Sequence, residues 1–258
     1  MYAFSTRFGV SRRPSRSGSS PRSVSSFLIA SCILLFYIPA LGAQSADALY
    51  ADRANLASAR RATAIWRAAL AADARDFDAA WKLARADYWL GGHGPDEERR
   101  KDLEDGIDAG RKAAAIQPNR PEGHFWIGAN MGALADSYGI RQGLKYRSSI
   151  KEELETVLRL DAAFLDGSAD RALGRWYFKV PRLFGGDRKL SESHLRQSLT
   201  YSANSTTSHF FLGELLQDEG RKDEARAEFQ KVIDAALSRD WAPEDQEFKE
   251  KAKRALAR

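Results

Sequence analysis

Apolar residues along the chain recur at intervals of three and four positions, the spacing that places them on one face of an α-helix. The clearest example is near the C-terminus, where Leu212, Leu216, Ala225 and Phe229 follow this spacing around Gly213. Long alternations of β-branched and polar residues, which would predict strands, are nearly absent. We therefore expect an all-α protein.

Several of the helical segments repeat one another. "HFWIGANM" at 124–131 and "HFFLGELL" at 209–216 share His, Phe, an aliphatic residue and Gly at the same positions. "ALGRWY" at 172–177 and "AWKLARADY" at 80–88 fall in the same register. The spacing around Gly213 matches the tetratricopeptide repeat (TPR), a helix–turn–helix unit of about 34 residues. The sequence thus predicts a TPR-like helical-repeat stack of about ten helices.

Three segments exceed the TPR consensus at the turn between the first helix (A) and the second helix (B) of a unit. They contain "GGHGPDEER" after Tyr88, "YGIRQGLKYR" at 138–147, and the stretch 178–189, in which Asp187 is expected to cap the next helix. We expect long turns here on one edge of the stack, because all A–B turns of a TPR stack project from the same edge. Acidic residues at the start of 240–258 and basic ones at its end predict a C-terminal capping helix.

Residues 1–43 have the layout of a signal peptide. Five Arg and no acidic residue precede an apolar run from Phe27 to Ile38, and small residues lead to Ala43. We expect cleavage after Ala43, a periplasmic or otherwise exported protein, and a mature domain at 44–258. Two alternatives stay open, and either one would tether the protein to a membrane: lipidation of Cys32 within "IASC", or an uncleaved N-terminal segment.

The basic pI of the whole chain comes from this leader. Its five charged residues are all Arg, so the mature part has 35 basic and 35 acidic residues. Because the mature part carries no net charge, we expect no nucleic-acid partner. The one cysteine, Cys32, also lies in the leader, which leaves the mature part without disulfides and without a thiolate nucleophile.

Sequence motifs for catalysis are missing. The chain has no H-E-x-x-H, no G-x-S-x-G and no Gly-rich phosphate loop. The four histidines are spread over separate elements; His124 and His209 occupy equivalent repeat positions, where we expect a structural role, since a metal would need further ligands at suitable spacing. We expect no enzyme activity, no cofactor and no metal.

Two of the expected long turns are basic, although the mature chain is neutral. Segment 138–147 has three cations and no acid, and 178–189 has four cations against Asp187 alone. We interpret this edge as a docking surface for an acidic protein partner, or as a site whose cations bind the carboxylate of an apolar ligand lying on aromatic side chains. In the alternative interpretation the aromatics are core and the charges only solvate the turns. The candidate residues are Arg141, Lys145, Arg147, Trp176, Phe178, Lys179 and Arg182.

The series "WKLARADYW" (81–89), "DAGRKAAAIQPN" (108–119), "EGHFWIGANMG" (122–132) and "LGRWYFKVPRLFGG" (173–186), closed by the C-terminal TPR, resembles the T component of TRAP-type transporters. It is also similar to the regulator-of-microtubule-dynamics proteins. The export signal favours the T component. That resemblance implies a periplasmic solute-binding protein as partner, homo-oligomers, and an internal passage for small apolar organic acids. The first hypothesis is therefore an exported accessory component of a TRAP-type system; the alternative is a TPR adaptor or scaffold of the cell envelope without its own ligand.

Overall fold

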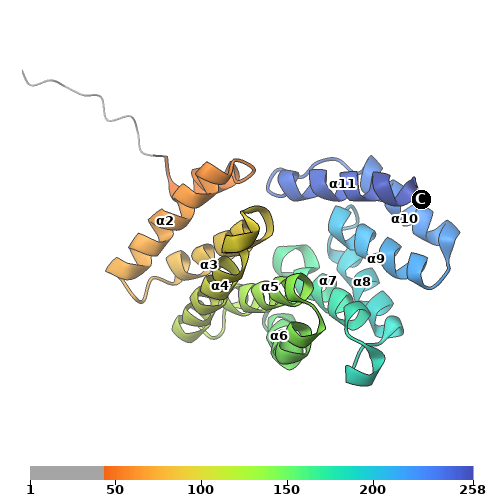
Figure 1. The fold of residues 1–258 in the computed structure, drawn as a ribbon, viewed down its shortest axis with the longest axis horizontal. Coiled ribbons are helices and arrows are strands. Elements are labelled where there is room, and N and C mark those ends of the chain that lie inside the picture. Colours follow the sequence, from red (N-terminus) through yellow and green to blue (C-terminus); the bar gives the residue numbers. More distant parts are fainter. Residues whose placement is uncertain (1–43, 258) are drawn as a thin grey trace, which may run out of the picture. The chain divides into compact units, whose positions relative to one another are not determined.

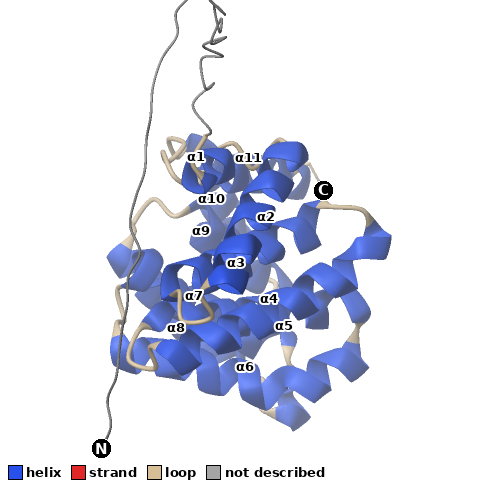
Figure 2. Ribbon diagram, turned by 90° about the vertical axis from the view of Figure 1, so that its left-hand side faces the viewer, coloured by secondary structure: helices blue, strands red, loops and turns tan. Residues whose placement is uncertain are grey.

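The computed structural model describes residues 44–257, which form eleven α-helices, one short 3₁₀ helix and no strand (Figure 1, Figure 2). The elements are α1 (Ala46–Ala51), α2 (Leu56–Ala72), α3 (Phe77–His93), α4 (Asp96–Ile116), α5 (Pro121–Tyr138), α6 (Ile140–Leu160), α7 (Phe164–Lys179), η1 (Arg182–Phe184), α8 (Arg188–Tyr201), α9 (Thr206–Asp218), α10 (Lys222–Asp234) and α11 (Ala242–Leu256). The expected all-α class is confirmed. The predicted signal peptide, its cleavage site and Cys32 lie outside the described residues.

Neighbouring helices pair into hairpins that stack along the chain. α3 packs on α4, α5 on α6, α7 on α8 and α9 on α10. The first helices of these pairs contact one another in the order α3, α5, α7, α9. Figure 1 shows that the described part curves around a central space, with α11 returning toward the first helices. This arrangement is a TPR-like stack, and α11 packs on α9 and α10 as its last layer.

Glycine allows close helix packing at two positions of the repeat. A Cβ added to Gly213 would lie 2.6 Å from Cε1 of Phe229, which is buried on α10. A Cβ added to Gly123 on α5 would lie 2.5 Å from the backbone nitrogen of Ala114 on α4. Real Cβ contacts are not this short, so α9 approaches α10 within one unit, and α5 approaches α4 of the preceding unit, only because these residues lack a side chain.

Most inserted residues lengthen helices rather than turns. The segment 138–147, which we expected as a turn, is helical from Ile140, because its residues continue the helical spacing of α6. Gly139 is the single residue between α5 and α6, and its φ of +76° falls in the region that favours glycine. The extra residues after Tyr88 likewise extend α3 and α4, leaving a short connection between them.

The α7–α8 connection is a true loop, as expected. α7 ends at Lys179, two residues before Pro181, and η1 follows. The loop is tight: its base is fixed by a hydrogen bond from the Asp187 N–H to the Tyr177 carbonyl (3.0 Å). Asp187 caps α8, because its Oδ1 accepts from the N–H of Lys189 at 2.8 Å. The predicted cap is therefore confirmed.

Polar side chains join the last helix to the start of the stack. Arg53, between α1 and α2, donates from Nε to Glu244 Oε1 (3.0 Å) and from Nη2 to the carbonyl of Asp240 (2.7 Å). At the end of α3, His93 Nε2 lies 2.5 Å from Glu247 Oε1. We call these five residues the closing contact. It completes a ring of helices and thereby encloses the space between them.

Candidate functional site

The two basic segments meet in the folded chain. The indole N–H of Trp176 on α7 donates to the carbonyl of Arg147 on α6 at 3.0 Å. The guanidinium of Arg147 also lies 5.8 Å from the centroid of the Phe184 ring, which belongs to η1. The structure thus brings 138–147 and 178–189 together, although the first of them is helical. We call this surface the basic edge.

Five cations of the basic edge have no acidic partner among the described residues. Arg141, Lys145, Lys179 and Arg182 are exposed and Arg147 is half-buried. Within residues 44–257 none of these five forms an ion pair, whereas Arg188, in the same segment 178–189, pairs with Asp218 on α9 at 2.6 Å. The positive charge of these five residues is therefore not neutralised by an acid of the described part.

The aromatic residues of the basic edge differ from the expectation in exposure. Trp176 is buried, as in the alternative interpretation, and Phe178 is half-buried, with the Lys179 ammonium 5.3 Å above its ring. The exposed apolar side chains are instead Leu183, at 87%, and Phe184, at 37%. These two residues were not predicted from the sequence. Their position after Pro181, which ends a helix, could have indicated their exposure, because no helix face covers side chains there.

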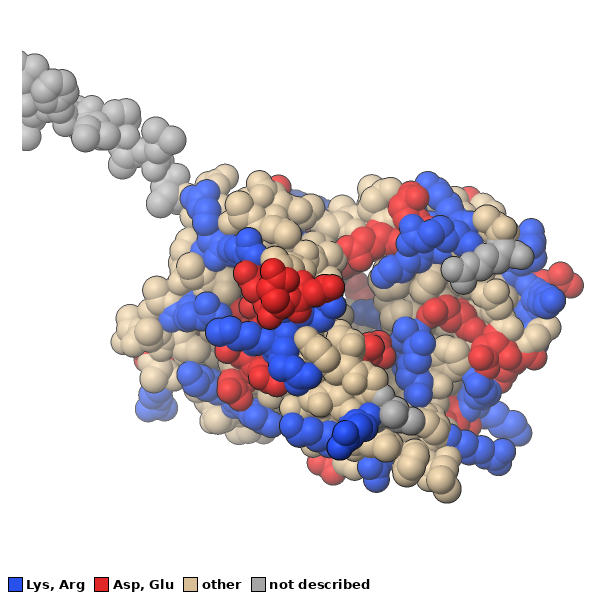
Figure 3. Space-filling view, in the orientation of Figure 1, with Lys and Arg blue, Asp and Glu red and all other residues tan. Residues whose placement is uncertain are grey.

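A cavity of about 1120 Å³ lies inside the ring of helices. Figure 3 shows its opening as a hollow at the centre of the molecule. The A helices α3, α5, α7 and α9 contribute to its wall, together with α6 and α11. Aromatic side chains give much of this wall its apolar character, namely Tyr88, Trp126, Phe210, Phe211 and Phe248.

Small residues on α5 leave room for this cavity. Ala129, Gly132 and Ala133 border it, and a Cβ added to Gly132 would meet nothing within 4 Å. Opposite them, Phe248 of α11 packs against Phe210 and Phe211 of α9, with ring centroids 5.3 and 5.6 Å apart. The run of small residues "GANMGALA" at 128–135 is the sequence feature that corresponds to this cavity. Small residues on a helix face are equally compatible with a cavity wall and with close packing against another helix, so the sequence does not predict which of the two forms.

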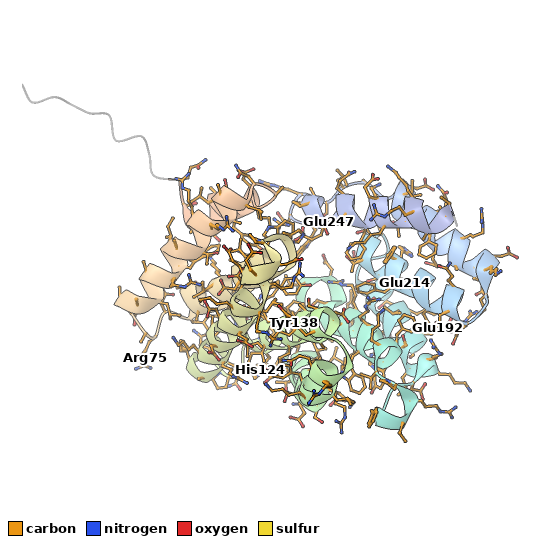
Figure 4. The ribbon with its side chains drawn as sticks, in the orientation of Figure 1. Arg75, His124, Tyr138, Glu192, Glu214 and Glu247 are labelled. Carbon is orange, nitrogen blue, oxygen red and sulfur yellow. The ribbon has the colours of Figure 1, made fainter. Side chains whose placement is uncertain are left out.

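One cation in the cavity wall is neutralised by acids. The Arg175 guanidinium on α7 forms an ion pair with Glu214 on α9 (2.5 Å) and lies 3.9 Å from Asp136 on α5. Its flat face covers the Phe211 ring at 4.6 Å. Figure 4 shows Glu214 on α9 beside the central space. Arg175 therefore ties three A helices together around the cavity.

The two equivalent histidines link the helices within their units. His124 Nδ1 lies 2.6 Å from Glu153, and His209 Nδ1 lies 2.5 Å from Glu228, each acid being on the B helix. The Nε2 atom of each ring faces a backbone carbonyl of the preceding turn, at 3.1 and 2.9 Å. Both rings are thus occupied by framework contacts. Among residues 44–257, no group of three or more His, Cys, Asp or Glu side chains is arranged to hold a metal ion.

A family model described as "Regulator of microtubule dynamics protein 1-3" matches residues 43–258. No curated protein matches the chain in sequence. Among solved structures, the thermophilic TPR protein TTC0263 from Thermus thermophilus is 22% identical, with a TM-score of 0.63 over 83% of this chain and 96% of that chain. Two crystal structures of MamA are each 16% identical over 78% of this chain and cover 95% and 90% of theirs, with TM-scores of 0.48 and 0.47. The first likeness confirms the TPR-like fold.

Proposed function

Because the chain belongs to the family described as regulator of microtubule dynamics protein 1-3, we propose that it is a non-catalytic TPR-type binding protein with two sites. The central cavity holds a small apolar organic acid, and the basic edge docks an acidic protein partner. Stacked helical repeats commonly present concave binding surfaces of this kind. The central cavity is the observation that carries the proposal.

The size and wall of the cavity favour a small molecule over a long peptide. Ligand sites are typically concave, mostly apolar and about 300–1,000 Å³ in volume, with a few polar groups that orient the ligand. The cavity has about this volume and an aromatic wall. The closing contact from Arg53 to Glu244 bridges the two ends of the stack, so an extended peptide would have to thread through the ring rather than lie in an open groove.

We further propose that the protein is exported and acts as an accessory of a TRAP-type transport system. In this role the protein partner is a periplasmic solute-binding protein, and homo-oligomers extend the passage for the acid. The leader-like sequence of residues 1–43 and the quoted resemblance support this role. No helix in the described part has the length and apolar character that a membrane span requires.

Native mass spectrometry of the protein purified from its own cells tests the ligand proposal. We expect a small organic acid to remain bound under gentle ionisation and to leave on activation. A solute-binding protein that co-purifies would support the transport role. If the chain is ligand-free as isolated and also binds no added apolar acid, the cavity is not a ligand site and the proposal is wrong.

The alternative, an envelope adaptor without a ligand, is favoured by the exposed Leu183 and Phe184 of the basic edge. Apolar side chains ringed by cations suit a protein interface, where anchors of this kind contribute most of the binding free energy. Both an adaptor and a transport accessory would use this surface to bind a protein partner. The cavity distinguishes them, because only the transport role requires an occupant there.

Charge removal tests the basic edge in either role. Replacing Arg141, Lys145, Lys179 and Arg182 by Ser removes four positive charges that form no ion pair within residues 44–257. We expect loss of partner binding with an unchanged helical fold. The matched control replaces four exposed cations on other helices or turns that also lack an ion pair in the described part: Arg61, Arg75, Lys112 and Lys222.

Arg75 of the control lies between α2 and α3, away from α6 and α7 (Figure 4). Partner capture is measured for both quadruple variants by pull-down from the same extract at two salt concentrations, since exposed charges are screened by salt. Equal binding by the edge variant and the wild type would remove the basic edge from the proposal.

A further inference from the structure

Arg171 is a cation in the cavity wall without an acidic partner. It lies one turn before Arg175 on α7 and borders the same cavity. The single hydrogen bond of its side chain within residues 44–257 runs from Nη1 to the carbonyl of Asp166 at 3.4 Å, which is long for such a bond. No acid of the described part lies within ion-pair distance of it. Burial lowers the pKa of the Arg171 guanidinium, but an arginine stays charged in proteins.

Asp245 and Asp166, two acids whose charge acts on Arg171, form no ion pair with it. Asp245 on α11 accepts from the Thr206 hydroxyl at 2.5 Å and from the Ser238 N–H at 2.8 Å. Asp166 is exposed, and its backbone carbonyl rather than its carboxylate meets the guanidinium. Several N–H donors of the half-buried Arg171 thus have no acceptor among the described residues and border the cavity, where a ligand could accept from them.

Two further donors of the cavity wall have no acceptor. The Tyr88 hydroxyl on α3 makes no hydrogen bond to another described residue, and its side chain is 38% exposed, toward the cavity that it lines. Tyr88 and Arg171 both border the central cavity. Trp126, whose ring centroid is 5.6 Å from that of Tyr88, leaves its buried indole N–H unpaired.

The backbone beside Arg171 is strained. Leu165, Asp166 and Gly167 have φ values of 44°, 58° and 72°, three consecutive residues in the left-handed region. A bulky residue such as Leu165 adopts this conformation at a cost of about 1–2 kcal/mol. Leu165 and Asp166 line the cavity, and this bend brings the Asp166 carbonyl to Arg171. Strain of this kind is concentrated at ligand sites.

From these observations we propose that Arg171 and Tyr88 form a carboxylate-binding subsite in the central cavity, with the apolar tail of the ligand against Trp126 and the small residues of α5. This inference rests on the proposed function and assigns the residues that recognise the acid group. A guanidinium binds a carboxylate through two parallel hydrogen bonds, and a phenol hydroxyl donates a third. The ligand class is a monocarboxylic acid with an apolar chain.

Arg175 provides the matched control. It is the same residue type on the same face of α7 and borders the same cavity, but Glu214 already neutralises it. Arg171→Met and Arg175→Met therefore remove the same charge and the same donors from the cavity wall. Our proposal predicts that only the first of them changes the preference for an acid over a neutral ligand.

The test measures binding of decanoate and of 1-decanol by titration calorimetry with the full chain. For the wild type we expect decanoate to bind more tightly than 1-decanol. Arg171→Met should weaken decanoate binding by about tenfold or more, because hydrogen bonds to charged groups contribute about 1.5–3 kcal/mol. It should leave 1-decanol binding nearly unchanged. Tyr88→Phe, which keeps the ring, should weaken decanoate binding by a smaller factor, and Arg175→Met should retain the preference for decanoate.

The outcomes separate this inference from the proposed function. If the wild type binds both probes and Arg171→Met binds decanoate as tightly as before, the cavity is a ligand site but Arg171 is not its acid receptor. If the wild type binds neither probe, the proposed function fails and the subsite with it. Should Arg171→Met not fold, Tyr88→Phe decides, since an unchanged ratio of decanoate to 1-decanol affinity in that variant overturns the subsite.

Discussion

Asp87 provides a quantitative test of how the stack packs, because it is a carboxyl group buried between helices. It is fully buried on α3, and its Oδ1 lies 3.4 Å from the Arg67 guanidinium of α2. Its Oδ2 has no hydrogen-bond partner within the described residues. Burial raises the pKa of Asp87 from 3.8 to about 8, against the opposing charge of Arg67. Asp87 therefore remains protonated in the folded protein at neutral pH.

This raised pKa makes the free energy of unfolding depend on pH. Below about pH 4 the carboxyl is neutral in both the folded and the unfolded chain, and its full contribution to stability is present. As the pH rises, the unfolded chain loses this proton first, so the contribution decreases until the folded carboxyl also ionises near pH 8. The pKa of Asp87 differs by about four units between the unfolded and the folded chain, and each unit corresponds to about 1.4 kcal/mol. The pH-dependent contribution of Asp87 to the free energy of unfolding therefore has an upper limit of about 6 kcal/mol.

Asp87→Asn removes this titration while keeping the shape of the side chain. We expect the variant to be less stable than, or about equal to, the wild type at about pH 4, and more stable by about 2–4 kcal/mol at about pH 9. The expected gain is below the upper limit because a buried charge draws in water and the structure relaxes around it. Urea unfolding followed by circular dichroism at several pH values gives the difference directly.

Asp105→Asn is the control, since Asp105 is the second acid near Arg67, at 3.3 Å, but lies at the surface of α4. Its stability difference from the wild type should stay within about 1 kcal/mol across the same pH range. If the difference between Asp87→Asn and the wild type does not vary between about pH 4 and pH 9, Asp87 ionises in the folded protein as it does in the unfolded chain, and the argument from its burial is wrong.

Two further predictions concern helix packing and the closing contact. Gly123→Ala should lower the free energy of unfolding by about 2 kcal/mol or more, because its Cβ would meet backbone atoms of α4. Gly132→Ala in the same helix should raise the free energy of unfolding by about 0.5–1 kcal/mol, because there is open space beside Gly132. Urea unfolding measures both differences. Burial opposes the charged form of His93, but the hydrogen bond to Glu247 and the Trp89 carbonyl raise its pKa. The stabilisation from this pair is therefore present below about pH 6.5 and lost as the pH rises through the raised pKa. Glu247→Gln should increase amide hydrogen exchange in α11 more at about pH 6 than at about pH 9, and an equal increase at both would contradict this.

The helical stack was predictable because its signals are local. Each unit carries its own spacing of apolar residues, and Gly213 meets Phe229 across a single turn. Helix ends were predictable for the same reason, since Pro181 and Asp187 act on residues beside them in sequence. The turn expected at 138–147 was wrong because extra residues that keep the helical period extend a helix as readily as they form a loop.

The central cavity was not predictable in the same way. It depends on Arg53 meeting Glu244, which lies 191 positions further along the chain, and no local pattern marks such a pair. The sequence also does not show which cations form an ion pair with an acid in the folded protein. Arg171 and Arg175 have the same helical neighbourhood, but only Arg175 finds an acid, and that acid lies on α9. The basic edge was easier to identify, because its cations lie close together in sequence.

The different surroundings of these two arginines lead to opposite expectations for stability. Arg175→Met leaves Glu214 without its partner inside the ring, so we expect a lower melting temperature. Arg171→Met removes a half-buried charge without an acidic partner in the described part. We therefore expect an unchanged or higher melting temperature, because replacing such a charge by an apolar side chain removes a desolvation penalty. Thermal unfolding of both variants without ligand measures this. With decanoate added, the melting temperature of Arg175→Met should rise more than that of Arg171→Met, because a ligand stabilises more the protein that binds it more tightly. If Arg171→Met unfolds as early as Arg175→Met without ligand, Arg171 stabilises the empty fold, and its lack of an acidic partner is no longer a reason to assign it to a ligand.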